Sequence, residues 1–312
     1  MSSLKDVASQ FRGGQLTRDG FWAAMRERHR VLREYRELIA DTSVDSITIQ
    51  GDALYVRTRE GISMMWDPED MGTAPNVMVN YGTYESEESD YLLRAAVGAT
   101  VIFDVGANVG FYSLHWASRL APGGTIHSFE PVPSTFSWLA RNIALNHLEE
   151  VIHANNFGLG DTPADVSLFV PDFTGCGAAS MRDLHPEEHS QELKIHLDTL
   201  DHYFSAAGLQ QLDLLKADVE GAELSVLRGA RETISRYHPL IFLELLRKWS
   251  RPFGYHPNDV IEMLRGFGYR CYTFGETGLI PFGSMNEETP QKNFFFAHPD
   301  RHASWLRTHN LA

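Results

Sequence analysis

Three apolar segments of strand-like composition each end in an acidic side chain. Asp104 follows the run T-V-I-F, Glu130 follows T-I-H-S-F, and Asp218 follows L-D-L-L-K-A. Apolar runs with little alternation are typical of central parallel strands that are covered on both faces. Because open α/β sheets bind their ligands at the carboxyl ends of the strands, these carboxylates are candidates for ligand contacts.

The loop after Asp104 carries Gly106 and Gly110 in the spacing D-x-G-x-x-x-G and leads into a helix-like segment. Glycines at a strand-to-helix turn let the backbone approach a ligand and leave helix N–H groups free to face it. The spacing differs from the G-x-G-x-x-G of pyrophosphate-binding dinucleotide folds. A carboxylate at the strand end suits a ligand with an ammonium and a sulfonium group better than a ligand with two phosphates. A purely structural turn is the alternative interpretation of this motif.

Glu130 stands twenty positions after Gly110, at the end of the second predicted strand. A carboxylate at that place, beside the glycine loop, can accept hydrogen bonds from both ribose hydroxyls of an adenosine ligand. The alternative is an exposed acid at a strand end, but the pairing with Asp104 favours ligand binding. The third predicted strand ends in N-N-F-G-L-G-D, where Asp161 or a nearby backbone group is a candidate contact for the adenine amino group.

Lys216, Asp218 and Glu220 cluster at the end of the fourth predicted strand, and P-L-I-F-L-E-L brings Glu244 to the same edge. Two carboxylates from neighbouring strand ends can act as a general base or hold a divalent cation. Ligation by oxygen alone favours magnesium or calcium over zinc. Glu220 is either a further cation ligand or an acid that stabilises the next helix N-terminus. His256, which precedes a proline, is another candidate base, although such a histidine is more often structural.

The elements that position these residues alternate between strand and helix patterns from Thr100 onward. Such alternation predicts an α/β fold with a mostly parallel sheet and helices on both faces. An additional strand pair with a glycine-rich stretch between its strands interrupts the alternation around residues 165–198. The predicted strands are 100–105, 125–130, 151–156, 212–218, 239–245, 269–274 and 292–297, and the predicted helices lie near 110–120, 134–147, 220–236 and 257–266.

Two domains are predicted, an N-terminal segment of residues 1–83 and a larger domain of residues 84–312. Residues 17–40 have apolar side chains at helical spacing, which predicts an amphipathic helix. We predict that this helix contributes to a homodimer interface, and packing of its apolar stripe within one chain is the alternative.

Between this helix and the larger domain, residues 45–66 contain alternating runs joined by turns. The turn at Gly51-Asp52 is a hairpin signal, so this stretch predicts a small antiparallel β-meander. A second helix is predicted to begin after Ser86 as its N-cap and to end at Gly98, directly before the first strand of the sheet.

The composition restricts the partners of the chain. Lys and Arg number 27 and Asp and Glu number 41, which gives 27 − 41 = −14. That balance argues against nonspecific nucleic-acid binding and against docking on anionic membranes. Cys176 and Cys271 are far apart and lack C-x-x-C spacing, so neither a disulfide framework nor a structural zinc site is predicted. No signal-peptide core and no apolar run of membrane-spanning length is present, and we therefore expect a cytoplasmic protein.

A series of motifs in a fixed order extends from about Tyr84 to His298. These motifs are Y-E-S-E, F-D-V-G-A-N-V-G-F-Y-S, S-F-E-P, N-I-A-L-N, G-L-G-D, L-D-T-L-D, L-K-A-D-V-E-G-A-E and F-L-E-L. In them the chain resembles the FkbM-type methyltransferases, which are S-adenosylmethionine-dependent enzymes of the class I fold. The resemblance implies a Rossmann-like sheet of seven strands whose last strand is antiparallel. The first eighty residues lie outside the resemblance.

The resemblance implies transfer of a methyl group from S-adenosyl-L-methionine to a hydroxyl group of a sugar, a glycan intermediate or a natural product. Participation of Mg²⁺ stays open, with Asp218, Glu244 and Glu220 as its candidate ligands. The residues predicted to bind the cofactor are Tyr84, Glu87, Asp104, Gly106, Ala107, Asn108, Gly110, Glu130, Pro131, Gly160, Asp161 and Asp218. The candidate catalytic residues are Asp218, Glu244, His256 and Lys216.

Two other functions remain as alternatives. One is a nicotinamide-dinucleotide-binding oxidoreductase, which the D-x-G-x-x-x-G spacing disfavours. The other is a module that binds S-adenosylmethionine without catalysis, which the pairing of Asp218 with Glu244 disfavours.

Overall fold

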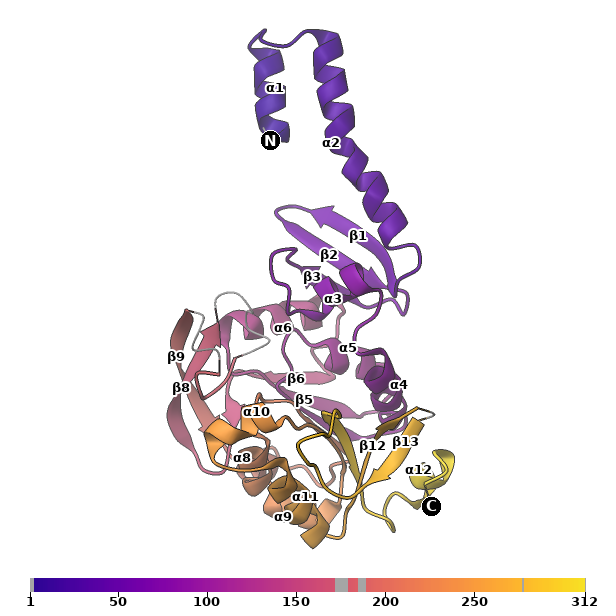
Figure 1. Ribbon diagram of the computed structural model, residues 1–312, viewed down its shortest axis with the longest axis vertical. Coiled ribbons are helices and arrows are strands. Elements are labelled where there is room, and N and C mark those ends of the chain that lie inside the picture. Colours follow the sequence, from indigo (N-terminus) through magenta and orange to yellow (C-terminus); the bar gives the residue numbers. More distant parts are fainter. Residues whose placement is uncertain (1–2, 172–178, 185–188, 277, 312) are drawn as a thin grey trace.

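The computed structural model describes residues 3–171, 179–184, 189–276 and 278–311 (Figure 1). Its centre is an eight-stranded sheet with the strand order β13-β12-β14-β11-β10-β4-β5-β6. The strands β11, β10, β4, β5 and β6 run parallel, whereas β14 is antiparallel to both of its neighbours. The bounds are β4 (Val101–Val105), β5 (Thr125–Phe129), β6 (Ile152–Asn155), β10 (Leu214–Ala217), β11 (Leu240–Glu244), β12 (Arg270–Gly275), β13 (Gly278–Phe282) and β14 (Asn293–Ala297).

This sheet confirms the predicted fold class. All seven predicted strands are present and the last of them, β14, is the antiparallel one. An eighth strand, β13, extends the edge because it forms a hairpin with β12. Every residue of β4 and of β10 is buried, which explains why their sequences are almost continuously apolar.

Helices cover both faces of the sheet and produce two apolar cores. Ile102 of β4 belongs to one core and its neighbour Phe103 to the other, as expected from side chains that alternate along a strand. The first core is completed by α4 (Ser86–Ala95), α5 (Phe111–Ala117) and α6 (Pro133–Leu145), and the second by α7 (Leu200–Ala206), α8 (Glu223–Arg228), α9 (Arg231–Tyr237) and α11 (Pro257–Gly266).

Two helix boundaries differ from the sequence-based prediction. The N-cap of α4 is Glu85, in a left-handed conformation, and Ser86 is the first helical residue. The helix predicted over 220–236 is two helices, α8 and α9, with a break at Gly229. Gly229 lies so close to Gly160 that an added Cβ would be 2.0 Å from the Gly160 carbonyl oxygen. Close packing of the two backbones therefore interrupts the helix.

The predicted extra strand pair forms a second, small sheet. Its strands are β7 (Gly158–Leu159), β9 (Ser190–Asp198) and β8 (Ala164–Pro171), in that order across the sheet. Most of the glycine-rich stretch between β8 and β9, residues 172–178, lies outside the described residues, and Cys176 lies there too. Cys271 is buried as a free thiol.

The N-terminal segment contains the predicted meander and a projecting pair of helices. The meander consists of β1 (Val44–Gln50), β2 (Ala53–Thr58) and β3 (Ser63–Trp66), followed by α3 (Ala74–Tyr81). The helices α1 (Leu4–Arg12) and α2 (Arg18–Leu38) extend away from the rest of the chain (Figure 1). None of the 21 residues of α2 is buried. The homodimer and the boundary at residue 83 remain predictions.

Two asparagines of the N-I-A-L-N motif attach the meander to the main sheet's helices. Asn142 accepts a hydrogen bond from the Met65 N–H at 2.8 Å, and Asn146 accepts one from the Ser63 N–H at 2.9 Å. The Asn146 amide also donates to the Ser63 carbonyl at 2.7 Å. These amides satisfy the free edge of β3, which would otherwise present unpaired backbone groups.

The described part of the chain holds no helix long and apolar enough to span a membrane.

The loop between β4 and α5 is held between the ends of two neighbouring strands. The N–H groups of Gly106 and Ala107 both donate to the Phe129 carbonyl at 3.0 Å. Gly106 has a φ of +76°, and an added Cβ there would lie 1.9 Å from the Asp218 carbonyl oxygen. Only glycine therefore lets this loop approach the end of β10 so closely.

We predict that Gly106→Ala destabilises the fold more than Gly98→Ala, which serves as a matched control. Both glycines have nearly the same positive φ, but a Cβ at Gly98 meets no atom within 4 Å. The clash at Gly106 should lower the free energy of unfolding by about 1–3 kcal/mol beyond the cost at Gly98. Urea denaturation of the two variants measures the difference, and equal losses of stability would contradict this role of Gly106.

Candidate active site

A cavity of about 260 Å³ opens at the carboxyl edge of the central sheet. Residues at the ends of β4, β5, β10 and β11 line it, at the edge where open α/β sheets bind ligands. Leu168, Ile195 and Leu197 of the small sheet form an apolar wall on another side. Ten residues predicted from the sequence line this cavity: Tyr84, Gly106, Ala107, Asn108, Glu130, Pro131, Lys216, Asp218, Glu220 and Glu244.

Glu130 is buried in the cavity wall directly after β5. Its Oε2 accepts a hydrogen bond from the Asn108 N–H at 3.0 Å, and its Oε1 accepts one from the Val132 N–H at 2.9 Å. Burial raises the pKa of Glu130 to about 7, and the two backbone hydrogen bonds oppose this rise. The carboxylate is thus fixed in orientation next to the glycine loop, and it retains lone pairs for further donors.

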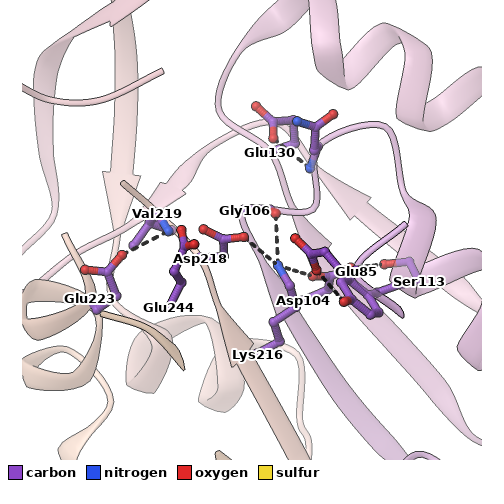
Figure 2. A network of polar contacts seen from close by, with 12 residues as sticks. Glu85, Asp104, Gly106, Ser113, Glu130, Lys216, Asp218, Val219, Glu223 and Glu244 are labelled. Carbon is purple, nitrogen blue, oxygen red and sulfur yellow. Dashed lines mark hydrogen bonds and ion pairs between the residues drawn. The ribbon is translucent and has the colours of Figure 1, made fainter. Parts of the chain in front are cut away.

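Lys216 lies at the centre of a buried charge chain (Figure 2). Its Nζ is 3.6 Å from Asp104 Oδ1 and 3.7 Å from Asp218 Oδ2. Burial disfavours the ammonium, but Asp218 and Asp104 hold the pKa of Lys216 above its ordinary value. Asp104 also accepts a hydrogen bond from Ser113 Oγ at 2.6 Å. Asp104 is fully buried beneath the cavity wall, so it acts on the cavity through Lys216.

Three carboxylates converge beside this chain. Asp218, Glu220 and Glu244 each present an oxygen atom, and these atoms lie within 4.8 Å of one another. Burial and the charge of Asp218 raise the pKa of Glu220 and of Glu244. Glu244 has Lys292 Nζ 3.0 Å from its Oε1, and Asp218 has Lys216 beside it. The Glu220 Oε2 is buried and has no hydrogen-bond partner among the described residues. Such an oxygen-only donor set suits a hard divalent cation.

Glu223 fixes the loop that carries Asp218 and Glu220. Its Oε1 accepts hydrogen bonds from the N–H groups of Val219 and Gly221, at 3.2 and 3.1 Å. The Tyr255 hydroxyl donates to its Oε2 at 3.0 Å. Figure 2 shows the Glu223 side chain directed toward the backbone of Val219, next to Asp218. Glu223 is therefore a structural residue of the site.

Glu85 is a cavity residue that the sequence reasoning missed. Glu87 was the glutamate predicted to border the site, but Glu87 lies in the first turn of α4 and does not line the cavity. The Glu85 Oε2 accepts a short hydrogen bond of 2.5 Å from the Tyr112 hydroxyl. Burial and the charge of Asp218 raise the pKa of Glu85. Its place directly after Tyr84 in the Y-E-S-E motif was the signal that could have identified it.

Three of the six described non-glycine residues with positive φ lie at the cavity. Glu85, Asn108 and Glu220 have φ values of 41°, 50° and 51°, and all three line the cavity. A left-handed conformation costs a residue other than glycine of the order of 1–3 kcal/mol. Residues held in such conformations cluster at functional sites, because the surrounding structure must impose them.

Three residues predicted near the adenosine end do not line the cavity. Gly110 is the N-cap of α5. The Gly160 N–H donates to the Asp198 carbonyl at 2.9 Å. Asp161 is exposed between β7 and β8, and it accepts a hydrogen bond from Ser225 Oγ at 3.3 Å. The preceding pair Gly158 and Leu159 lines the cavity in place of Gly160 and Asp161.

His256 also lies away from this cavity. It is the N-cap of α11, where its Nδ1 accepts a hydrogen bond from the Asn258 N–H at 3.2 Å. The Asp259 carboxylate accepts one from the His256 N–H at 2.9 Å, which completes a capping box. His256 lines a separate cavity, so the structure does not bring it to the acids of the first one.

Several proteins named as methyltransferases are similar to this chain. "Methyltransferase 1" of Beauveria bassiana is 34% identical over 144 residues, which cover 41% of this chain and 57% of that protein. The hexuronic acid methyltransferase AglP of Haloferax volcanii is 24% identical over 173 residues, covering 55% of this chain and 64% of that protein. The 31-O-demethyl-FK506 methyltransferase FkbM of Streptomyces tacrolimicus is 26% identical over 208 residues, covering 54% and 72%.

The family comparison covers most of the central sheet and most of the residues that line the cavity. The family model named methyltransferase FkbM domain matches residues 104–271, which extend from the end of β4 into β12. The matched segment contains Asp104, Glu130, Lys216, Asp218 and Glu244. The chain belongs to the methyltransferase FkbM domain family.

Proposed function

We propose that this protein is an S-adenosyl-L-methionine-dependent O-methyltransferase that acts on a hydroxyl group of a sugar, a glycan intermediate or a natural product. The observation that carries the proposal is one cavity with Glu130 beside a glycine loop and with Asp218 and Glu244 at neighbouring strand ends. Membership of the FkbM family supports the reaction class. Relatives named for a hexuronic acid and for a 31-O-demethyl compound support the acceptor class.

The residues of the cavity fit the proposed cofactor. Glu130 offers its carboxylate to the ribose hydroxyls, and the Leu168, Ile195 and Leu197 side chains offer an apolar surface to the adenine ring. The acidic groups of Glu85 and Asp218 suit an ammonium and a sulfonium group. When bound, S-adenosylmethionine supplies a methyl group on a positively charged sulfur, which is already a good electrophile.

The acidic groups of the cavity disfavour the alternative function, that of an oxidoreductase that binds a nicotinamide dinucleotide. A pyrophosphate would have to bind beside the carboxylates of Asp218, Glu220 and Glu244, where like charges repel it. Lys216 does not offset this repulsion, because Asp104 and Asp218 already surround its ammonium.

The acceptor hydroxyl requires activation, since an alcohol is a poor nucleophile at neutral pH. We propose that Asp218 and Glu244 remove or hold its proton, either directly as a base or through a divalent cation that they bind together with Glu220. Lys216 orients Asp218, because its ammonium nitrogen lies 3.7 Å from the Asp218 Oδ2. The fixed walls of the cavity position the hydroxyl against the methyl group, which contributes much of the rate enhancement.

The raised pKa of Glu130 predicts that cofactor affinity depends on pH. Both of its oxygens already accept backbone hydrogen bonds, so a proton on either one competes with the native contacts. Only the ionised form can accept those bonds and two ribose donors as well. With a pKa of about 7, the affinity for S-adenosylhomocysteine should be about eightfold weaker at pH 6 than at pH 7.5.

Isothermal titration calorimetry at the two pH values measures this effect, with Glu130→Gln as the control. The variant should bind more weakly at pH 7.5, by about 1–3 kcal/mol, and should show little dependence on pH. A wild-type affinity that stays constant between pH 6 and 7.5 would contradict the assignment of Glu130 to the cofactor.

The catalytic proposal is tested by single-turnover methylation of an accepted substrate with wild type, Asp218→Asn and Glu244→Gln. Each substitution keeps the size of the side chain and removes its charge, so the rate should fall by roughly a hundredfold or more. Binding of S-adenosylhomocysteine should change far less. Near-normal rates in both variants would overturn the roles of Asp218 and Glu244.

A metal chelator distinguishes activation of the hydroxyl by a bound cation from activation by a carboxylate base. Loss of the wild-type rate with chelator and recovery with magnesium would select the cation version. A rate that is indifferent to chelator would select a carboxylate base.

A further inference from the structure

A second cavity, of about 760 Å³, lies beside the proposed active site. It is bounded by α10 (Arg247–Ser250), by the 3₁₀ turn Arg251–Phe253 that follows and by the loop before β14. Four of its lining residues carry basic side chains: Arg247, Lys248, Arg251 and His256. The single acidic residue in the lining is Glu287, and its side chain is 95% exposed to solvent. This cavity is thus basic in a chain whose net charge is −14.

The two cavities adjoin along the chain and across the sheet. Glu244 lines the first cavity, and the next two residues, Leu245 and Leu246, line the second. Lys292 pairs with Glu244 at 3.0 Å, and its neighbour Gln291 lines the second cavity. Consecutive residues of the chain therefore line the two cavities, and Lys248 of the second is close enough to Glu220 of the first to lower its pKa.

Two basic residues in the wall of the second cavity bind neighbouring backbone. The Arg247 guanidinium donates to the backbone carbonyls of Asn286, Glu287 and Thr289, and so holds the loop before β14 in place. His256 is fixed as the N-cap of α11. These two basic residues are thus engaged in structural contacts.

Lys248 and Arg251 are different, because neither side chain makes an ion pair with a described residue. The charge of Lys248 does act on Glu220 of the first cavity, where it lowers the pKa of that carboxyl group against the larger effect of burial. The Lys248 ammonium lies 4.2 Å from the centroid of the Trp249 ring and makes no ion pair with a described residue. Arg251 makes neither an ion pair nor a side-chain hydrogen bond within the described ranges. Two cationic side chains that line the same cavity without an ion pair favour a ligand with an anionic group.

We propose that the second cavity binds an oxyanion of the acceptor, a phosphate or a carboxylate, while the acceptor hydroxyl lies at Asp218 and Glu244. This inference rests on the proposed function and narrows its substrate class: the acceptor is an anionic molecule such as a sugar nucleotide or a sugar acid, and uncharged sugars are poor substrates. Lys248 and Arg251 are the residues that recognise the anion.

Isothermal titration calorimetry at low ionic strength tests this proposal, with uridine diphosphate and glucuronate as separate probes. The double variant Lys248→Ala/Arg251→Ala is compared with Arg26→Ala/Arg33→Ala, which removes the same two charges from exposed positions of α2. At least one probe should bind the wild type and the α2 variant equally, and should bind the cavity variant at least tenfold more weakly. Binding of uridine diphosphate identifies a phosphate site, and binding of glucuronate alone identifies a carboxylate site.

The proposal is overturned if neither probe binds the wild type, or if the cavity variant binds as tightly as the α2 variant. S-adenosylhomocysteine is titrated in parallel and should bind all three proteins alike. Failure of the wild type to bind S-adenosylhomocysteine would contradict the proposed function, whereas the anion titration reports on Lys248 and Arg251 independently of it.

Discussion

The arrangement at the carboxyl edge depends on one buried ammonium group, that of Lys216. An unpaired charge in the interior is very costly, and a buried ion pair is tolerated only when its partners are well placed. Lys216 lies between Asp104 and Asp218, and its charge offsets part of the negative charge gathered there. Removing it would leave the buried Asp104 and the half-buried Asp218 without compensation, so the fold and the site share this constraint.

Even with Lys216 in place, the cavity contains more negative than positive groups. The pKa values of Glu85, Glu220 and Glu244 are all raised by burial and by Asp218, which is the expected response to excess negative charge. A bound cation would relieve that excess. The site therefore suits positively charged partners, and the adjoining basic cavity around Lys248 suits negatively charged ones. We propose that this separation of charge orients the acceptor.

The sequence was sufficient for the sheet and for the acids at its edge. Apolar runs with little alternation are typical of central strands, and an acid directly after such a run is expected at the strand end. Glu130, Asp218 and Glu244 do lie at strand ends and line one cavity, and their roles remain predictions. Details set by backbone geometry were beyond that reasoning. The left-handed residue Glu85 turns the chain, so that it, and not Glu87, lines the cavity. The close approach of Gly229 to Gly160, which interrupts a predicted helix, involves residues about seventy positions apart.

The central claim is that this edge of the sheet binds an adenosine cofactor with a sulfonium group and not a dinucleotide. Equilibrium binding of S-adenosylmethionine and of NAD to the purified protein, measured side by side, tests it most directly. The charges around Asp218 and the contacts of Glu130 predict saturable binding of S-adenosylmethionine and no detectable binding of NAD at the same concentrations. Binding of NAD without binding of S-adenosylmethionine would contradict the claim.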